Sequence, residues 1–154
     1  STFDWGVKDA DGYFFILGRT DDVINVAGHR LGTREIEESS SSHPNVAEVA
    51  VVGVADSLKG QVALAFAVPR DATGLDDAAA RLKLEGEVMK QVDKQLGAVA
   101  RPSRVFFVTT LPKTRSGKLL RRALQAVAEG RDPGDLTTME DPAALQQVRA
   151  MVGV

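Results

Sequence analysis

The chain of 154 residues contains no cysteine, only two histidines and few aromatic residues, which make up 5% of the total. The absence of cysteine excludes disulfides, thiolate metal sites and a cysteine nucleophile. It also fits a reducing compartment, so we predict a cytoplasmic protein. His29 and His43 are the only histidines and are too few to suggest a zinc site, so we expect no metal site in this chain.

Long apolar runs and an excess of positive charge are also missing. No segment approaches the roughly 18 apolar residues of a membrane span, and the opening STFDWGVKDADG lacks the apolar stretch of a signal peptide. The 19 basic and 21 acidic side chains give a formal net charge of -2, which does not favour a surface that follows nucleic-acid phosphates. We therefore expect neither a membrane nor a nucleic acid among the partners.

What the sequence does contain is a series of short apolar runs, and apolar residues make up 44% of the chain. They predict a small α+β domain with a mixed sheet and packed helices, preceded by a β-hairpin over about residues 5–17. Expected strands cover 23–26, 46–56, 61–70 and 104–112, and expected helices run from Thr33 to His43-Pro44, from Leu75 onward, and over 119–128.

Two further patterns concern packing and boundaries. In the second helix the sevenfold spacing of Leu75, Leu82, Met89 and Leu96, supported by Ala78, Ala79 and Val92, predicts one apolar stripe toward the core. The polar stretch GRTDDVIN indicates a boundary near Asp21, and the Gly/Pro/Asp-rich segment after residue 130 indicates a partly helical tail over 131–154.

Five cations lie within ten positions of the segment LPKTRSGKLLRR, residues 111–122. Apolar residues with helical spacing follow, so we expect Lys118 at the start of a helix, where the helix dipole disfavours a cation by about 0.3 to 1 kcal/mol. Helix stability therefore does not explain this lysine. Free N–H groups, a glycine and several cations would suit an anionic oxygen, whereas a solvated run of charge is the alternative. The phosphate-binding P-loop is excluded because Pro112 and Leu119 occupy its required positions.

A second basic pair, His29 and Arg30, stands between two glycines in GHRLG. Gly28 and Gly32 either permit a tight turn or let the backbone approach a thin ligand, with Arg30 available to bind a phosphate. The residues alone leave both interpretations open. Arg19, by itself, is interpreted as a surface arginine.

In this order, DGYFFILGRTDDVINVAGHRLGTREIEE and LPKTRSGKLLRR resemble the carboxy-terminal domain of the adenylate-forming, AMP-forming acyl-CoA synthetases. The segment GHRLGT is similar to the acetyl/propionyl-CoA synthetase branch, and in detail the sequence resembles a propionate–CoA ligase, with acetate–CoA ligase as the alternative. The resemblance covers nearly the whole chain. Because the chain starts at STFDWG without an initiator methionine and lacks the family's ATP-binding loop, we expect an inactive fragment of a longer enzyme.

The resemblance implies two half-reactions. A short-chain carboxylate and ATP with Mg²⁺ give an acyl-adenylate and pyrophosphate, and CoA then attacks to give the thioester and AMP. Between the steps a mobile domain, here 21–130, would swing relative to the missing amino-terminal adenylation domain, of which residues 1–20 are the end. The fragment alone is expected to bind none of these substrates firmly.

The resemblance also implies roles for individual residues. Lys118 is the adenylation lysine, which donates to carboxylate and phosphate oxygens as negative charge builds up. Arg19 contacts the nucleotide ribose, Asp21 is the hinge, and Gly28 lies beside the pantetheine tunnel, with His29 and Arg30 on the CoA side. Lys118 is further expected to be a target of a lysine acyltransferase and a deacylase.

One position departs from the family pattern. Where related acetyl-CoA synthetases carry an arginine for the CoA 3′-phosphate, this chain has Asp93, and Lys94 is the candidate to substitute for it. A stand-alone module that uses the basic segment to bind an anionic partner, without catalysis, remains the rival hypothesis.

Overall fold

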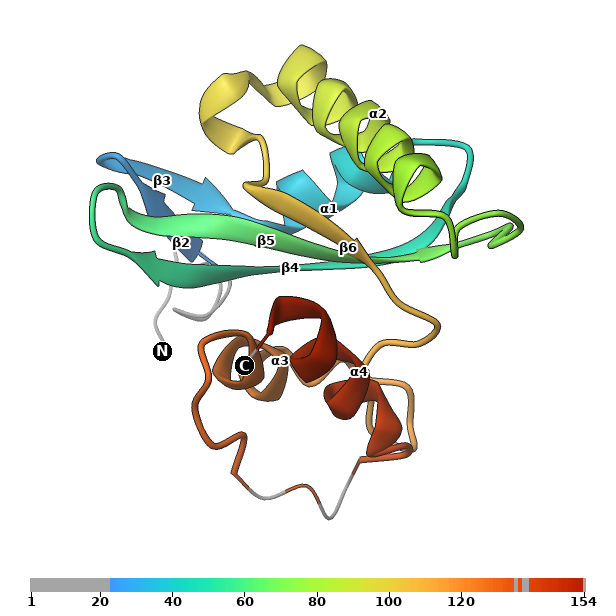
Figure 1. Ribbon diagram of the computed structural model, residues 1–154. Helices are drawn as coiled ribbons and strands as arrows, with labels where there is room; N and C mark the ends of the chain where they lie inside the picture. Colours follow the sequence, from blue (N-terminus) through green and yellow to red (C-terminus); the bar gives the residue numbers. More distant parts are fainter. Residues whose placement is uncertain (1–22, 135, 137–138, 154) are drawn as a thin grey trace.

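The computed structural model describes residues 23–134, 136 and 139–153, and Figure 1 shows a sheet with helices on both faces. The hairpin expected over residues 5–17, together with Arg19 and Asp21, lies outside the described residues. The strands are β2 (Val23–Val26), β3 (His29–Gly32), β4 (Val46–Asp56), β5 (Gly60–Pro69) and β6 (Arg104–Phe107). The helices are α1 (Thr33–Ser41), α2 (Ala78–Leu96), the 3-10 turn η2 (Ala98–Ala100), α3 (Arg121–Ala128) and α4 (Ala143–Val152).

The sheet has the strand order β3–β2–β5–β4, and β6 pairs with β5. The pairing between β5 and β6 is parallel, and the other pairs are antiparallel. The mixed sheet with packed helices confirms the predicted α+β class. None of the helices in the described ranges is long and apolar enough to cross a membrane.

The side chains of β4 and β5 alternate between two apolar layers. Val51 and Ala65 belong to the layer that α1 and α2 cover, whereas Val52 and Phe66 belong to the layer that α3 and α4 cover. Successive residues of a strand point to opposite faces, so a sheet covered on both sides requires nearly continuous apolar runs. This explains why both strands could be recognised in the sequence.

The free edge of β4 is covered by one side of α3. Three polar side chains, four residues apart, reach backbone groups of alternate residues of β4. Arg121 Nη1 donates to the Val51 carbonyl at 2.6 Å, Gln125 Nε2 donates to the Gly53 carbonyl at 2.6 Å, and the Ala55 N–H donates to Glu129 Oε2 at 2.9 Å. The α3 side chains thereby satisfy backbone groups that an edge strand would otherwise present to another chain.

The apolar stripe expected for α2 was only partly correct. The helix begins at Ala78, and the side chains of Leu82 and Leu96 are 62% and 38% exposed. The buried apolar residues of the helix are Leu84, Val88 and Val92, spaced four apart, of which only Val92 was part of the expected stripe. Leu75 and Met89 are partly buried and pack against the core, so the sevenfold spacing selected residues at the border of the buried face as well as exposed ones.

A buried carboxylate explains why the buried face of α2 was hard to recognise. Glu85 is 6% exposed and lies on the same side of the helix as Leu84 and Val88. Its Oε2 accepts hydrogen bonds from the Val105 N–H at 2.7 Å and from Arg104 Nε at 2.8 Å. A buried charge is tolerated when it is paired and hydrogen-bonded in this way.

Candidate functional site

The basic segment forms a tight hairpin between β6 and α3. Lys113 and Leu119 form an antiparallel bridge, and the Gly117 N–H donates to the Thr114 carbonyl at 2.9 Å. The Thr114 N–H donates to the Lys118 carbonyl at 2.8 Å, and Gly117 has a φ of 90°. A short turn that ends in a positive-φ glycine is typical of a hairpin closed by a bulge.

Lys118 therefore does not lie at the start of a helix, as the sequence had suggested. It is an exposed residue of the hairpin, and α3 begins three residues later at Arg121. Its N–H donates to Thr114 Oγ1 at 3.1 Å, across the turn of the hairpin. The expected destabilisation by the helix dipole consequently has no basis, because the effect falls off within the first turn.

The five cations of this segment have different surroundings. Lys113 forms an ion pair with Glu48, and Arg121 forms one with Glu37 at 2.5 Å. Within the described residues, neither Arg115 nor Lys118 has a hydrogen-bonding or ionic side-chain partner, and both are exposed. The segment is thus not a uniformly solvated run of charge.

Gly28 occupies a two-residue turn between β2 and β3. Ala27 and Gly28 have φ values of 50° and 86° between the paired residues Val26 and His29, as in a type I′ turn. No atom of the described residues lies within 4 Å of a Cβ added to Gly28. In the segment GHRLG, Gly28 thus ends a tight turn, one of the two interpretations of its glycines, and a strand with exposed His29 and Arg30 follows it.

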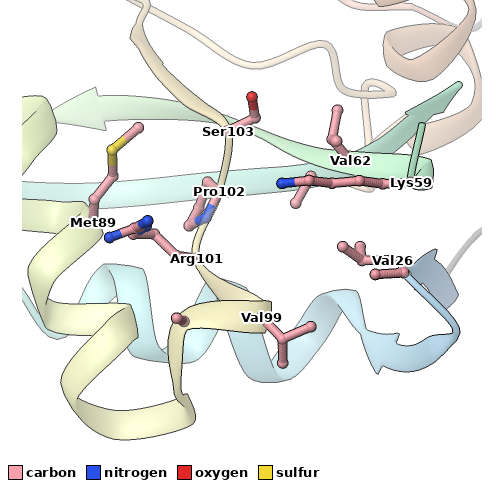
Figure 2. A pocket seen from close by; sticks show the side chains of 11 residues that line it. Val26, Lys59, Val62, Met89, Val99, Arg101, Pro102 and Ser103 are labelled. Carbon is pink, nitrogen blue, oxygen red and sulfur yellow. The ribbon is translucent and has the colours of Figure 1, made fainter. Parts of the chain in front are cut away.

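A cavity of about 380 Å³ lies directly beside this turn, and Figure 2 shows the side chains that line it. The Ala27 N–H donates to the Lys59 carbonyl at 2.9 Å, which joins the β2–β3 turn to the β4–β5 turn at the rim. The lining combines two cations, Lys59 and Arg101, with apolar side chains: Val26, Val62, Met89, Val99 and Pro102. A cavity that combines apolar side chains with charged groups can accommodate a small molecule that has both characters.

The residues that the family pattern places near the 3′-phosphate lie at the end of α2. Lys94 is exposed in the last turn of the helix and does not line the cavity. Asp93 lies one residue before it, and its Oδ2 is 3.5 Å from Nη1 of Arg101. Neither Arg101 nor Lys59 stands in a motif that would have identified it from the sequence, yet both line the cavity.

The hairpin with Lys118 and the turn with Gly28 are at opposite ends of the sheet. Lys113 contacts Glu48 near the start of β4, whereas the β2–β3 turn contacts the segment that follows Asp56 at its end. Glu48 and Asp56 are eight positions apart along the strand, or about 26 Å. Figure 1 shows the chain leaving β6 at the far end of the sheet from the β2–β3 turn.

Carboxylates near these features are not arranged to bind a metal ion. In the part of the chain that the structure describes, no group of three or more His, Cys, Asp or Glu side chains could hold one. Glu37 and Glu48, which the sequence analysis did not single out, instead form ion pairs with the basic segment.

Comparison with known families gives one match over this region. Residues 35–118 match the family described as AMP-binding enzyme C-terminal domain. The matched range includes the β4–β5 turn, α2 and the hairpin up to Lys118.

Individual enzymes are similar over nearly the whole chain. The propionate–CoA ligase of Salmonella typhimurium (strain LT2) is 65% identical over 152 residues, which are 99% of this chain and 24% of that enzyme. The propionate–CoA ligase of Escherichia coli (strain K12) is 67% identical over 97% of this chain. An acetyl-coenzyme A synthetase of Pyrobaculum aerophilum is 49% identical over 95% of the chain. The chain spans about a quarter of the length of these propionate–CoA ligases.

Solved structures agree with these similarities. An acyl-CoA synthetase from Brucella canis has a TM-score of 0.56 at 40% identity, over 67% of this chain and 18% of that one. The structure of apo MatB from Rhodopseudomonas palustris has a TM-score of 0.62 at 31% identity, over 77% of this chain and 22% of that one.

Proposed function

Because the chain belongs to the family of AMP-binding enzyme C-terminal domains, we propose that it is the carboxy-terminal domain of an ATP-dependent acyl-CoA synthetase that acts on propionate. The observation that carries this proposal is the 65% identity to a propionate–CoA ligase across 99% of the chain. In the intact enzyme, propionate and ATP with Mg²⁺ would give propionyl-adenylate and pyrophosphate. CoA would then displace AMP and form propionyl-CoA.

The geometry supports separate roles for the two ends of this domain, one in each half-reaction. Lys118, exposed at the tip of its hairpin, would serve the first half-reaction by donating to oxygens where negative charge develops. Gly28 and the adjoining cavity, at the other end of the sheet, would serve the second. A domain that presents its two ends in turn to the adenylation domain would need a hinge, which we propose at Asp21. Arg19 would contact the nucleotide ribose.

Assays of the intact enzyme with acetate, propionate and butyrate test the proposal. We expect AMP and acyl-CoA to form fastest from propionate at limiting substrate. A preference for acetate would favour the second candidate, because acetyl-coenzyme A synthetases are also similar over most of the chain. Failure to form AMP from any of the three acids would favour a binding module without catalysis. A cytoplasmic location remains a prediction.

The cavity beside the β2–β3 turn is our candidate for the anionic end of CoA. Its two cations can donate to phosphate oxygens, and its apolar lining can accommodate a pantetheine chain or a base. Arg101 faces Asp93 at 3.5 Å with half of its side chain exposed, so a phosphate could replace or share that contact. His29 and Arg30 on the neighbouring strand would lie along the same ligand, and Lys94 remains a candidate contact.

Replacing Lys59 or Arg101 by alanine should raise the KM for CoA about tenfold, since one charge-assisted hydrogen bond contributes about 1.5 kcal/mol. Adenylation, measured by pyrophosphate exchange, should not change. Lys83→Ala removes an exposed cation of α2 that does not line the cavity and serves as the control. Comparison of CoA with dephospho-CoA would identify whether the 3′-phosphate is the group bound. An unchanged KM in both variants would exclude the cavity.

Gly28→Leu should lower the thioester half-reaction by tenfold or more and leave adenylation within a few fold. The new side chain would project into space that is open in this chain and that we assign to pantetheine. Gly74→Leu is a matched control, because Gly74 has a φ of 81° and equally open surroundings. Both variants carry the same backbone strain. Equal losses of thioester formation in the two variants would remove Gly28 from the CoA path.

A further inference from the structure

Ion pairs on both sides of the turn join the hairpin that carries Lys118 to the sheet and α1, in addition to its backbone contacts with Met139 and Glu140. Before the turn, Lys113 pairs with Glu48 of β4, and after it, Arg121 pairs with Glu37 of α1. The first pair is substantially exposed, with side chains 30% and 46% accessible. The second is more protected, with Arg121 13% and Glu37 17% accessible. Exposed ion pairs contribute little, so the pair between Arg121 and Glu37 is the stronger candidate for fixing the hairpin.

Glu37 and Arg121 bind each other, and both also bind the backbone of Val51 in the edge strand β4. Arg121 donates to both oxygens of Glu37, from Nη1 at 2.5 Å and from Nη2 at 3.2 Å. Glu37 Oε2 also accepts the Val51 N–H at 2.8 Å, and Arg121 Nη1 donates to the Val51 carbonyl at 2.6 Å. A planar guanidinium held by two carboxylate oxygens and a carbonyl has a defined orientation as well as a defined position.

The contacts of Arg121 fix the point at which the hairpin ends and α3 begins. Arg121 is the first residue of α3, and the Leu120 N–H donates to the Pro112 carbonyl at 2.9 Å, which closes the base of the hairpin. Lys118 lies only three residues before Arg121. A shift of the Arg121 side chain would therefore displace the start of α3 and, through this short segment, the ammonium group of Lys118.

We propose that Glu37 is a positioning residue for adenylation, which holds Lys118 in place by binding Arg121 and Val51. The inference rests on the role proposed for Lys118 and adds a residue from α1 that would not touch the substrates. Reactive groups lose efficiency steeply when misplaced, and a displacement of 1 Å can cost about a hundredfold in rate.

Glu37→Gln in the intact enzyme should lower the kcat of adenylation about ten- to hundredfold, with little change in the KM for ATP or propionate. Glutamine keeps the size and one acceptor oxygen but loses the charge that holds the guanidinium. Conversion of supplied propionyl-adenylate and CoA to propionyl-CoA should remain within about threefold, because Gly28 and the cavity are at the other end of the sheet. A merely structural role for Glu37 would reduce both half-reactions in proportion to the loss of folded enzyme.

Glu129→Gln provides a matched control. Glu129 also accepts a backbone N–H of β4, that of Ala55 at 2.9 Å, and its side chain is 18% exposed. It lies at the other end of α3 from the hairpin, so its loss should lower the melting temperature without separating the two half-reactions. If Glu129→Gln and Glu37→Gln give the same ratio of half-reaction rates, the inference is wrong.

Arg121→Lys is the second variant, for use if Glu37→Gln does not fold. Lysine keeps the positive charge but cannot bind both oxygens of Glu37 and the Val51 carbonyl in the same fork geometry. We expect the same selective loss of adenylation, about tenfold or more. Normal adenylation by folded Arg121→Lys would contradict the inference.

A double variant separates this inference from the proposed function. If Glu37 acts only through Lys118, adding Glu37→Gln to Lys118→Ala should not lower the residual pyrophosphate exchange further. If the losses of the two single variants multiply in the double variant, Glu37 does not act through Lys118, and the role of Lys118 itself is unaffected. Full adenylation by Lys118→Ala alone would overturn both.

Discussion

Lys118→Ala in the intact enzyme should lower acyl-adenylate formation by about two to three orders of magnitude or more, which corresponds to removing a donor from a developing negative charge. The fold should not be affected. Lys118 is exposed, and its backbone bonds to Thr114 do not depend on the ammonium group. Thioester formation from supplied acyl-adenylate should remain within a few fold, because the CoA-side features lie at the opposite end of the sheet from the hairpin.

The measurement is a pair of half-reaction assays. Pyrophosphate exchange reports adenylation, and release of AMP from synthetic propionyl-adenylate and CoA reports the second step. Lys83→Ala, which removes an exposed lysine from α2, should leave both rates unchanged. A loss of equal size in the two half-reactions would mean that Lys118 is not specific to adenylation.

The elements of this fold could be predicted mainly where burial on two sides made the pattern unambiguous. The strands β4 and β5 were recognisable because Val51 and Val52 enter different apolar layers, so neither face of the strand is polar. The helix α3 was recognisable for a related reason, since Leu124 and Val127 recur with helical spacing on its buried side.

Local geometry around Lys118 could not be predicted from the same patterns. Apolar residues with helical spacing begin at Leu119, but the chain is still paired with Lys113 at that point. Gly117, with a φ of 90°, and the two bonds between Thr114 and Lys118 keep the segment in a hairpin. Hydrophobic periodicity reports which side chains are buried and does not report where the backbone first becomes helical.

Ion pairs between residues far apart in the sequence could not be predicted. Glu37 and Arg121 are 84 residues apart, and each is a common surface residue type when considered alone. Only the strand order, which places β4 at the sheet edge between α1 and α3, brings such residues together.

Acylation of Lys118 in the intact enzyme is our remaining prediction, and its effect should be nearly as large as that of alanine. An acyl group removes the positive charge and lengthens the side chain, so the donor to the developing negative charge is lost. A lysine acyltransferase and an acyl-CoA should therefore reduce adenylation by about two to three orders of magnitude. A deacylase should restore it, and thioester formation from supplied acyl-adenylate should persist throughout.

The structure also predicts which lysine of the hairpin is acylated first, and the same experiment can measure this. Lys118 is exposed on a hairpin, with no ionic partner in the described part of the chain, whereas Lys113 in the same hairpin is paired with Glu48. An acyltransferase needs an accessible amine, so mass spectrometry should find Lys118 modified well before Lys113. Because the Lys118 ammonium group contributes no contact to the fold, the acylated protein should keep its melting temperature. Modification confined to other lysines, or full adenylation by protein acylated stoichiometrically at Lys118, would contradict this control of the first half-reaction.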